Sequence, residues 1–173
     1  MGLPQNLIVG GHSQGCAMSL AVLLSLGHSV GVYIDMSGFL TYQDDLKSVV
    51  NDKVDSDNPL SHPREPQDTT VDASAVKAQE LERDHLDLGP LHRPYQGKTA
   101  YQTPVLLGLG KADEKVPCAL GERAVQFLQD SGYQVEWKCY ENQGDWYKIN
   151  DEIDGICNFI ALKVRWEPVN NIA

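Results

Sequence analysis

The chain has 173 residues, of which 42% are hydrophobic and 22% charged, so it is long enough to bury one core. Its formal net charge of −10 repels phosphate backbones and argues against nucleic-acid binding. No apolar run approaches the roughly 20 residues that span a bilayer, and the N-terminal residues lack the features of a signal peptide. We therefore expect one cytoplasmic domain over residues 1–173, without a transmembrane segment.

Four cysteines are widely spaced along the chain, at Cys16, Cys118, Cys139 and Cys157. They form no CxxC pair and have no histidine at ligand spacing, so no zinc site is expected. Each lies in an apolar segment, where a free buried thiol is the simplest interpretation. The sequence accordingly predicts neither a metal nor a cofactor.

The first forty residues predict a strand, a helix and a second strand. Leu7–Val9 is an apolar run that ends at two glycines, as expected of a buried parallel strand. An apolar helix follows from Cys16 to Leu26 and stops at Gly27. Val30–Ile34 is expected to form the next strand, which makes this segment a βαβ unit.

The composition changes between residues 42 and 98. Twelve of the 24 acidic residues lie between Asp44 and Asp87, and five prolines lie between Pro59 and Pro94. A short polar helix is expected over residues 77–85 and loop elsewhere. The segment has too few apolar residues for a core of its own, so we interpret it as an exposed, partly ordered insertion.

Regular structure is predicted again from residue 103. Val105–Leu109 is again predicted to be a buried strand, and the apolar face of residues 120–128 predicts a helix that ends at Ser131-Gly132. Alternation over Val135–Cys139 predicts a strand covered on one face. Isoleucines at helical spacing from 149 to 160 predict the last helix. The fold class is α/β, with a mostly parallel sheet flanked by helices.

Residues 11–15 read Gly-His-Ser-Gln-Gly, between an apolar strand and an apolar helix, which is the context of a nucleophile elbow. Ser13 is expected to adopt a strained backbone, and side chains at Gly11 or Gly15 are expected to collide with the neighbouring strand or helix. The turn would expose the Ser13 hydroxyl and aim the Gln14 backbone N–H at a developing oxyanion. The alternative is a glycine-rich βα turn that binds a phosphate.

Three blocks cover nearly all of the chain outside the insertion. The first runs from Ile8 to Gly15 and on through residues 33–40, the second is Thr103–Pro117, and the third is Tyr140–Trp146 followed by the terminal helix. Together they resemble the acyl-protein thioesterase and carboxylesterase/phospholipase family of serine hydrolases. The resemblance implies an α/β-hydrolase fold, Ser13 as nucleophile, and acyl esters or thioesters as substrates, on an acylated protein or a lysophospholipid.

The resemblance also implies a triad acid. In the family, the aspartate before a Val-Pro pair has this role, which corresponds to Asp113 ahead of Val116-Pro117. The order of serine, aspartate and third block is the order of α/β-hydrolase triads. Asp113 would then orient an imidazole and stabilise its charged form. The alternative is an ordinary loop aspartate before a helix.

The third block departs from the family at the position of the catalytic histidine. The family has Gly-His-Trp, whereas this chain has Gly144-Asp145-Trp146. A carboxylate with a reference pKa of about 4 is a weak base toward a serine hydroxyl and, once ionised, has no proton for the leaving group. It would also repel Asp113 or share a proton with it. We predict that Asp145 does not function as the base.

No other histidine is an evident substitute. His12 precedes the serine, but successive side chains at an elbow diverge, and His28 follows the far end of the elbow helix. His62, His85 and His92 lie in the insertion and are expected to be solvated loop residues.

The resemblance further implies an N-terminal half that donates a second oxyanion N–H. Met1 stands only a few residues before the elbow strand, so we expect an N-terminally truncated member, the C-terminal half of the fold. Gln14 would then supply half of the oxyanion hole, and a hydrophobic sheet edge at Leu7–Val9 would be exposed. For the same reason, Asp145→His alone is expected to restore little activity.

Three functions remain open from the sequence. The first is a serine hydrolase that forms an acyl-enzyme on Ser13. The second is a catalytically impaired relative that binds acyl chains or a partner. The third is an unrelated α/β module that binds an anion at the elbow, against which the blocks around Asp113 and Trp146 argue. We predict little or no hydrolase activity for the chain as written.

Overall fold

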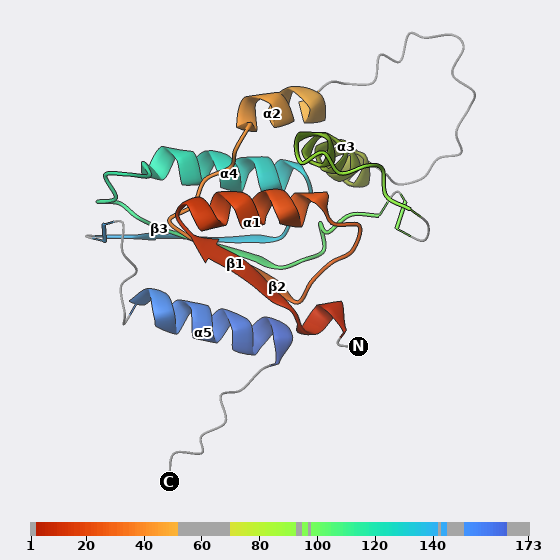
Figure 1. Ribbon diagram of the computed structural model, residues 1–173. Helices are drawn as coiled ribbons and strands as arrows, with labels where there is room; N and C mark the ends of the chain where they lie inside the picture. Colours follow the sequence, from red (N-terminus) through yellow and green to blue (C-terminus); the bar gives the residue numbers. More distant parts are fainter. Residues whose placement is uncertain are drawn as a thin grey trace.

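The computed structural model describes residues 3–51, 70–92, 95, 96, 98–141, 143, 144 and 151–165. Its centre is a parallel sheet of four strands in the order β1-β2-β3-β4, formed by β1 (Ile8–His12), β2 (Val32–Met36), β3 (Val105–Gly110) and β4 (Val135–Tyr140) (Figure 1). The register pairs Gly11 with Asp35 and Leu109 with Cys139. The predicted α/β class and parallel sheet are therefore confirmed.

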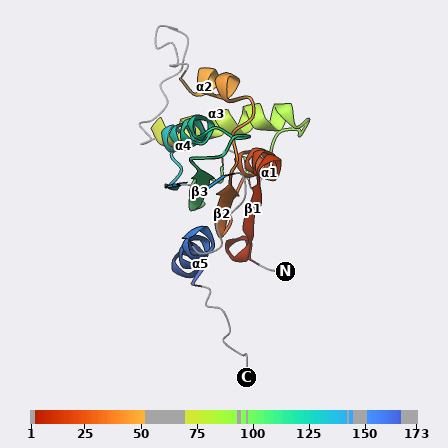
Figure 2. The ribbon, with the colours of Figure 1, turned by 90° about the vertical axis from the view of Figure 1, so that its left-hand side faces the viewer.

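Helices cover both faces of this sheet. The helices α1 (Gln14–Ser25) and α4 (Cys118–Asp130) lie on one face, and α5 (Asp151–Val164) lies on the other (Figure 2). Each is close to the range that apolar periodicity predicts, because a one-sided apolar stripe has to face a sheet. A single 3-10 turn, Pro4–Asn6, precedes β1.

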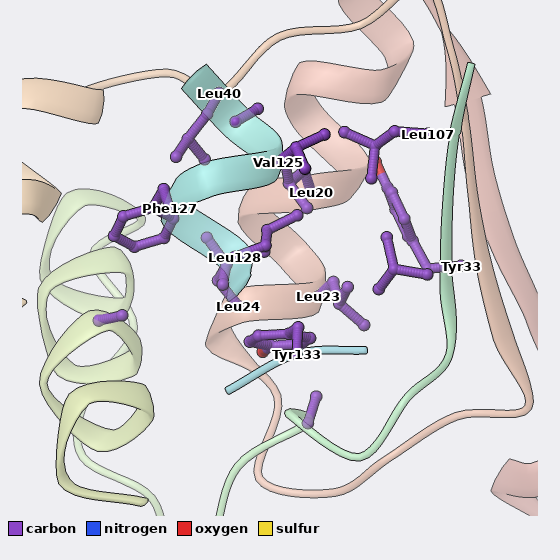
Figure 3. Packing of buried hydrophobic residues seen from close by; sticks show 14 of the residues in the cluster. Leu20, Leu23, Leu24, Tyr33, Leu40, Leu107, Val125, Phe127, Leu128 and Tyr133 are labelled. Atoms are coloured by element: carbon purple, nitrogen blue, oxygen red, sulfur yellow. The ribbon is translucent and has the colours of Figure 1, made fainter. Parts of the chain in front are cut away.

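The larger core lies between the sheet and the face that carries α1 and α4. Leucines of α1 point toward Val125 and Leu128 of α4 and toward Tyr33 and Leu107 of the sheet (Figure 3). A smaller core under α5 joins Val32, Ile34, Leu106, Phe159 and Ile160. Tyr33 and Ile34 thus face opposite cores, as the alternation of a strand buried on both faces requires.

The segment interpreted as an insertion contributes to the main core. It contains α2 (Gln43–Asn51) and α3 (Thr70–His85), and both pack on the α1 and α4 layer. Leu46 of α2 and Ala78 of α3 are fully buried in that core. The short helix expected over 77–85 is therefore too short, because alanine and glutamine carry the buried face of α3 and give no strong apolar signal.

Strand β1 lies at an edge of the described sheet. Leu7 is 52% exposed and Ile8 45%, which confirms a hydrophobic edge among the described residues. Met18 and Val22 are also exposed, on the adjacent helix α1. None of the helices in the described part of the chain has both the length and the apolar character that crossing a bilayer requires.

Candidate active site

Ser13 lies at the junction of β1 and α1 with a backbone that L-residues rarely adopt. Its φ is 53° and its ψ is −122°, outside the ordinary left-handed region. Two backbone hydrogen bonds hold the turn. The Ser13 N–H donates to the Met36 carbonyl at 2.9 Å, and the Ser13 carbonyl accepts the Cys16 N–H at 2.9 Å. Strain of this kind persists only where surrounding contacts impose it, and it is common at functional sites.

The two glycines of the elbow differ in what they permit. A Cβ on Gly11 would lie 2.6 Å from the Gly15 carbonyl carbon and 2.8 Å from the Cys16 nitrogen. These are backbone atoms of the first turn of α1, so the collision predicted for Gly11 is confirmed. A Cβ on Gly15 would meet no atom of the described residues within 4 Å. The collision predicted for Gly15 is therefore wrong for the described part of the chain.

Gln14 is the first residue of α1, directly after the serine. The N–H groups of the first helical turn have no acceptor within the helix, and the helix dipole adds partial positive charge there. The backbone N–H of Gln14 therefore belongs to the positive end of α1, one residue after Ser13.

Asp113 lies in the loop that joins β3 to α4 and is only 6% exposed. Its Oδ1 accepts the backbone N–H groups of Lys115 and Val116, both at 2.9 Å. Its Oδ2 is buried and has no hydrogen-bond partner among the described residues. A carboxylate held by one oxygen and open at the other is what a triad acid requires, because the open oxygen can accept an imidazole N–H.

Asp145 lies outside the described residues, as does Trp146. The structure does describe Gln143 and Gly144, which pack against the end of β3: a Cβ on Gly110 would lie 2.1 Å from the Gln143 carbonyl oxygen. Ala112 donates its N–H to the same carbonyl at 2.9 Å. Ser13 follows β1, Asp113 follows β3 and Gln143 follows β4, so the three predicted blocks meet at the carboxyl edge of one parallel sheet. Ligands of open α/β sheets bind at this edge.

The described histidines have the following positions. The ring of His28 packs on Tyr95 with centroids 5.6 Å apart. His85 is exposed, packs on Tyr42 and lies 3.8 Å from the Glu82 carboxylate; it is the last residue of α3 and so does not lie in a loop. His92 is exposed beyond α3, and His12 is half-buried at the end of β1. His62 lies outside the described residues.

The sequence interpretation missed a buried acidic residue beneath the elbow. Asp35 is the next-to-last residue of β2 and is 1% exposed, and its Oδ1 accepts the Gly38 N–H at 2.8 Å. The Cys16 thiol lies beside it and donates to the Gly11 carbonyl at 2.6 Å. A Cβ on Gly38 would strike both Cys16 and Asp35, so this loop packs directly under the elbow. The signal in the sequence was a carboxylate within an otherwise apolar strand.

The environment of Asp35 disfavours its charge. Burial raises the pKa of the carboxyl to about 7, and the nearby Glu152 carboxylate adds to the rise, whereas hydrogen bonds from Cys16 and Gly38 oppose it. Glu152 is itself 1% exposed and accepts the Gln143 side-chain N–H at 2.7 Å. Two buried carboxyls from β2 and α5 therefore lie near the same edge of the sheet.

We expect Asp35→Asn to remove a loss of stability that occurs in the wild type as the pH rises from about 4 to about 7. An unfolded aspartate has a pKa of about 3.9, so between about pH 4 and pH 7 the folded chain holds a proton that the unfolded chain has released. Stability then falls as pH rises through this window, by up to about 1.4 kcal/mol per pH unit. Urea unfolding at pH 5 and pH 8 measures this effect. Between the two pH values, the free energy of unfolding of the variant should rise by about 2–3 kcal/mol relative to that of the wild type. Parallel pH curves for the two proteins would contradict the assignment.

Comparisons with known proteins identify sequences and solved structures that are similar to this chain. No protein-family model matches the chain. Acyl-protein thioesterase 1 of Gibberella zeae is 25% identical over 94% of this chain and 50% of its own length, and acyl-protein thioesterase 1 of Saccharomyces cerevisiae is 24% identical over 91% and 49%. The crystal structure of Arabidopsis thaliana SOBER1 matches 94% of this chain and 55% of its own with a TM-score of 0.61 at 20% identity.

Over most of its length the chain is similar in sequence to proteins named acyl-protein thioesterase 1, and it has the parallel α/β fold of the solved structures that it matches. The structural match establishes the fold, and the sequence matches establish the relatives. The chain spans about half the length of the curated relatives it matches.

Proposed function

We propose that Ser13 is the acyl acceptor of an acyl-ester and acyl-thioester site, and that this chain turns such substrates over only very slowly. The observation that carries the proposal is the strained φ and ψ of Ser13 at the β1–α1 junction, enforced by the Gly11 contact with α1. A phosphate-binding turn needs N–H groups at a helix start but has no use for a strained serine. The arrangement therefore favours covalent acyl transfer over anion binding.

Each residue has a defined role in the proposed site. The Ser13 hydroxyl would attack the acyl carbonyl and the Gln14 N–H would stabilise the oxyanion, giving an acyl-enzyme that water hydrolyses. The Asp113 Oδ2 would accept the N–H of a base that removes the hydroxyl proton. The relatives are named for acyl-protein thioesters, so an acylated protein is the first candidate substrate and a lysophospholipid the second.

The catalytic base is the member of the family's triad that differs in this chain. In the third block of the sequence, Asp145 stands where the family has histidine. The residue before it, Gly144, packs against the end of β3. An ionised carboxylate neither takes a proton efficiently from serine nor returns one to the leaving group. In a serine-protease triad, loss of the histidine lowers turnover on the order of 10⁶-fold. Asp145 is also the observation that favours a second function, an acyl-binding or interaction protein.

Steady-state turnover tests the proposal. The chain is incubated with a short-chain p-nitrophenyl ester and with the matching acyl thioester, beside Ser13→Ala. Because triad members act as a unit, the wild type should be within about tenfold of Ser13→Ala on both substrates. A wild-type rate thousands of times above that of Ser13→Ala would show a functional base and overturn the impaired-turnover proposal.

A further inference from the structure

We propose that Cys118 and Cys139 are a redox-active pair that a peroxide converts into an intramolecular disulfide. Their sulfur atoms lie 3.0 Å apart, although the residues are 21 positions apart in the sequence. A disulfide bond is about 2.0 Å long, so the two sulfurs need to approach by only about 1 Å. The two thiols are already adjacent in the reduced fold.

The packing around the pair holds the two sulfurs on facing surfaces. Cys118 is the first residue of α4, and Cys139 is the fifth residue of β4. Trp137, two residues before Cys139, shares its face of the strand, and a Cβ on Gly121 of α4 would lie 2.8 Å from the Trp137 ring. The same helix face thus meets the same strand face at two successive positions, which fixes the register between Cys118 and Cys139.

Both sulfurs are accessible to a small oxidant, in contrast with Cys16. Cys118 and Cys139 are half-buried, whereas Cys16 is completely buried beneath the elbow and Cys157 is an isolated exposed residue on α5. All four cysteines are free thiols, as expected, but the expectation of burial is correct for Cys16 only. The sequence also did not predict the contact of Cys118 with Cys139, because spacing does not show which cysteines a parallel sheet brings together.

The resting state of the pair is the dithiol. The pKa of Cys118 is raised to about 12, mainly because the thiol is removed from solvent. The neighbouring Cys139 thiol and the Glu122 carboxylate add to the rise, and the Lys111 ammonium opposes it. The thiolate is the form that reacts with peroxide, so the raised pKa makes oxidation slow at neutral pH and faster as the pH rises. One thiol is oxidised by hydrogen peroxide to a sulfenic acid with release of water. The second sulfur then displaces the hydroxyl as another water, so two thiols and one peroxide give one disulfide and two waters.

The cross-link would fasten the two segments that flank Asp113. The Asp113 loop ends at Cys118, and β4 leads from Cys139 to the residues that hold this loop. Lys111 donates its N–H to the Tyr140 carbonyl and Ala112 to the Gln143 carbonyl, both at 2.9 Å. A disulfide would close these hydrogen-bonded segments into a covalent ring. The oxidised chain should therefore unfold at a higher temperature, because the cross-link restricts the unfolded state.

Mass spectrometry of the full chain tests this inference independently of any hydrolase activity. The chain is treated with hydrogen peroxide, unfolded in the presence of iodoacetamide, and its alkylated thiols are counted. We expect four alkylated thiols before treatment and two after, a linked peptide pair containing Cys118 and Cys139, and recovery of four thiols with dithiothreitol. Cys157→Ser is the matched control and should still form the link, whereas Cys139→Ser and Cys118→Ser should not.

Thermal unfolding provides a second readout. Peroxide should raise the melting temperature of the wild type and of Cys157→Ser, and leave that of Cys139→Ser unchanged. Four alkylated thiols after treatment would overturn the inference, and so would links confined to Cys157 between two chains. A link that forms equally well in the chain unfolded by urea would also overturn it, because the fold would then play no part.

Discussion

Replacing Asp145 with histidine is expected to make ester turnover depend on Ser13 while leaving it at least about 10²-fold below that of a complete site. The imidazole would supply the missing base, and the Asp113 Oδ2 is a buried acceptor for its N–H. Gln14 is the one oxyanion donor that the family resemblance assigns within these 173 residues. Loss of one such donor costs about 10²- to 10³-fold in turnover. The substitution alone should therefore restore only a small part of the activity.

A set of four variants measures this dependence. Turnover of a short-chain p-nitrophenyl ester is compared in Asp145→His, Asp145→Asn, Ser13→Ala, and the double variant with Ser13→Ala and Asp145→His. Only Asp145→His should rise above the others, and the double variant should lose that gain. Asp113→Asn in the Asp145→His background should also lose it, because Asp113 acts through the imidazole. Full rescue by Asp145→His would show that the Gln14 half-site suffices, and no dependence on Ser13 would place the chemistry elsewhere.

Alanine at Gly11 should destabilise the fold strongly, whereas alanine at Gly15 should not. The added Cβ at Gly11 would lie 2.6–2.8 Å from three backbone atoms of residues 15 and 16, and backbone cannot rotate out of the way. Overpacking of this kind costs typically 1–3 kcal/mol and sometimes more, so we expect a loss of about 3 kcal/mol. Gly15 is in the first turn of α1 with open space around its Cα, so alanine there should change stability by less than about 1 kcal/mol, on the stabilising side.

Urea unfolding of the two variants measures the difference directly. Both replace a glycine of the same pentapeptide by the same residue, so each is the control for the other. Equal unfolding midpoints would contradict the close approach of Gly11 to the helix. A strong loss in the Gly15 variant would indicate that the space near Gly15 is filled in the folded protein.

The secondary structure of the sheet and its covering helices followed from local pattern. Strands such as Val105–Gly110 are continuous apolar runs because both faces are buried, and this is detectable without any tertiary information. The elbow was predictable for the same reason, since Ser13 stands between a strand signal and a helix signal. Its left-handed φ follows from the tight turn that Gly11 permits. Asp113 could be proposed from its resemblance to a family, but its half-satisfied carboxylate required the structure.

The features that the sequence did not predict depend on contacts between segments that are distant along the chain. The buried face of α3 consists of small and polar residues such as Ala78 and Gln79, whose burial comes from packing on α1 rather than from hydrophobicity. The contact of Cys118 with Cys139 arises from the packing of α4 on β4, which spacing along the chain does not show. Asp35 stood out in the sequence only as a carboxylate in an apolar strand, and its position under the elbow comes from the pairing of β1 with β2.

The central claim is that the elbow keeps its geometry while Ser13 is not activated. Intact-mass analysis after incubation with a fluorophosphonate tests it directly, because the reagent adds to a serine whose hydroxyl proton is removed by a positioned base. Circular dichroism on the same sample confirms that the chain is folded. We predict that the wild type gains no more reagent than Ser13→Ala does, and that no adduct maps to Ser13. A stoichiometric adduct that maps to Ser13 would contradict the account, since it would require a working base beside the serine.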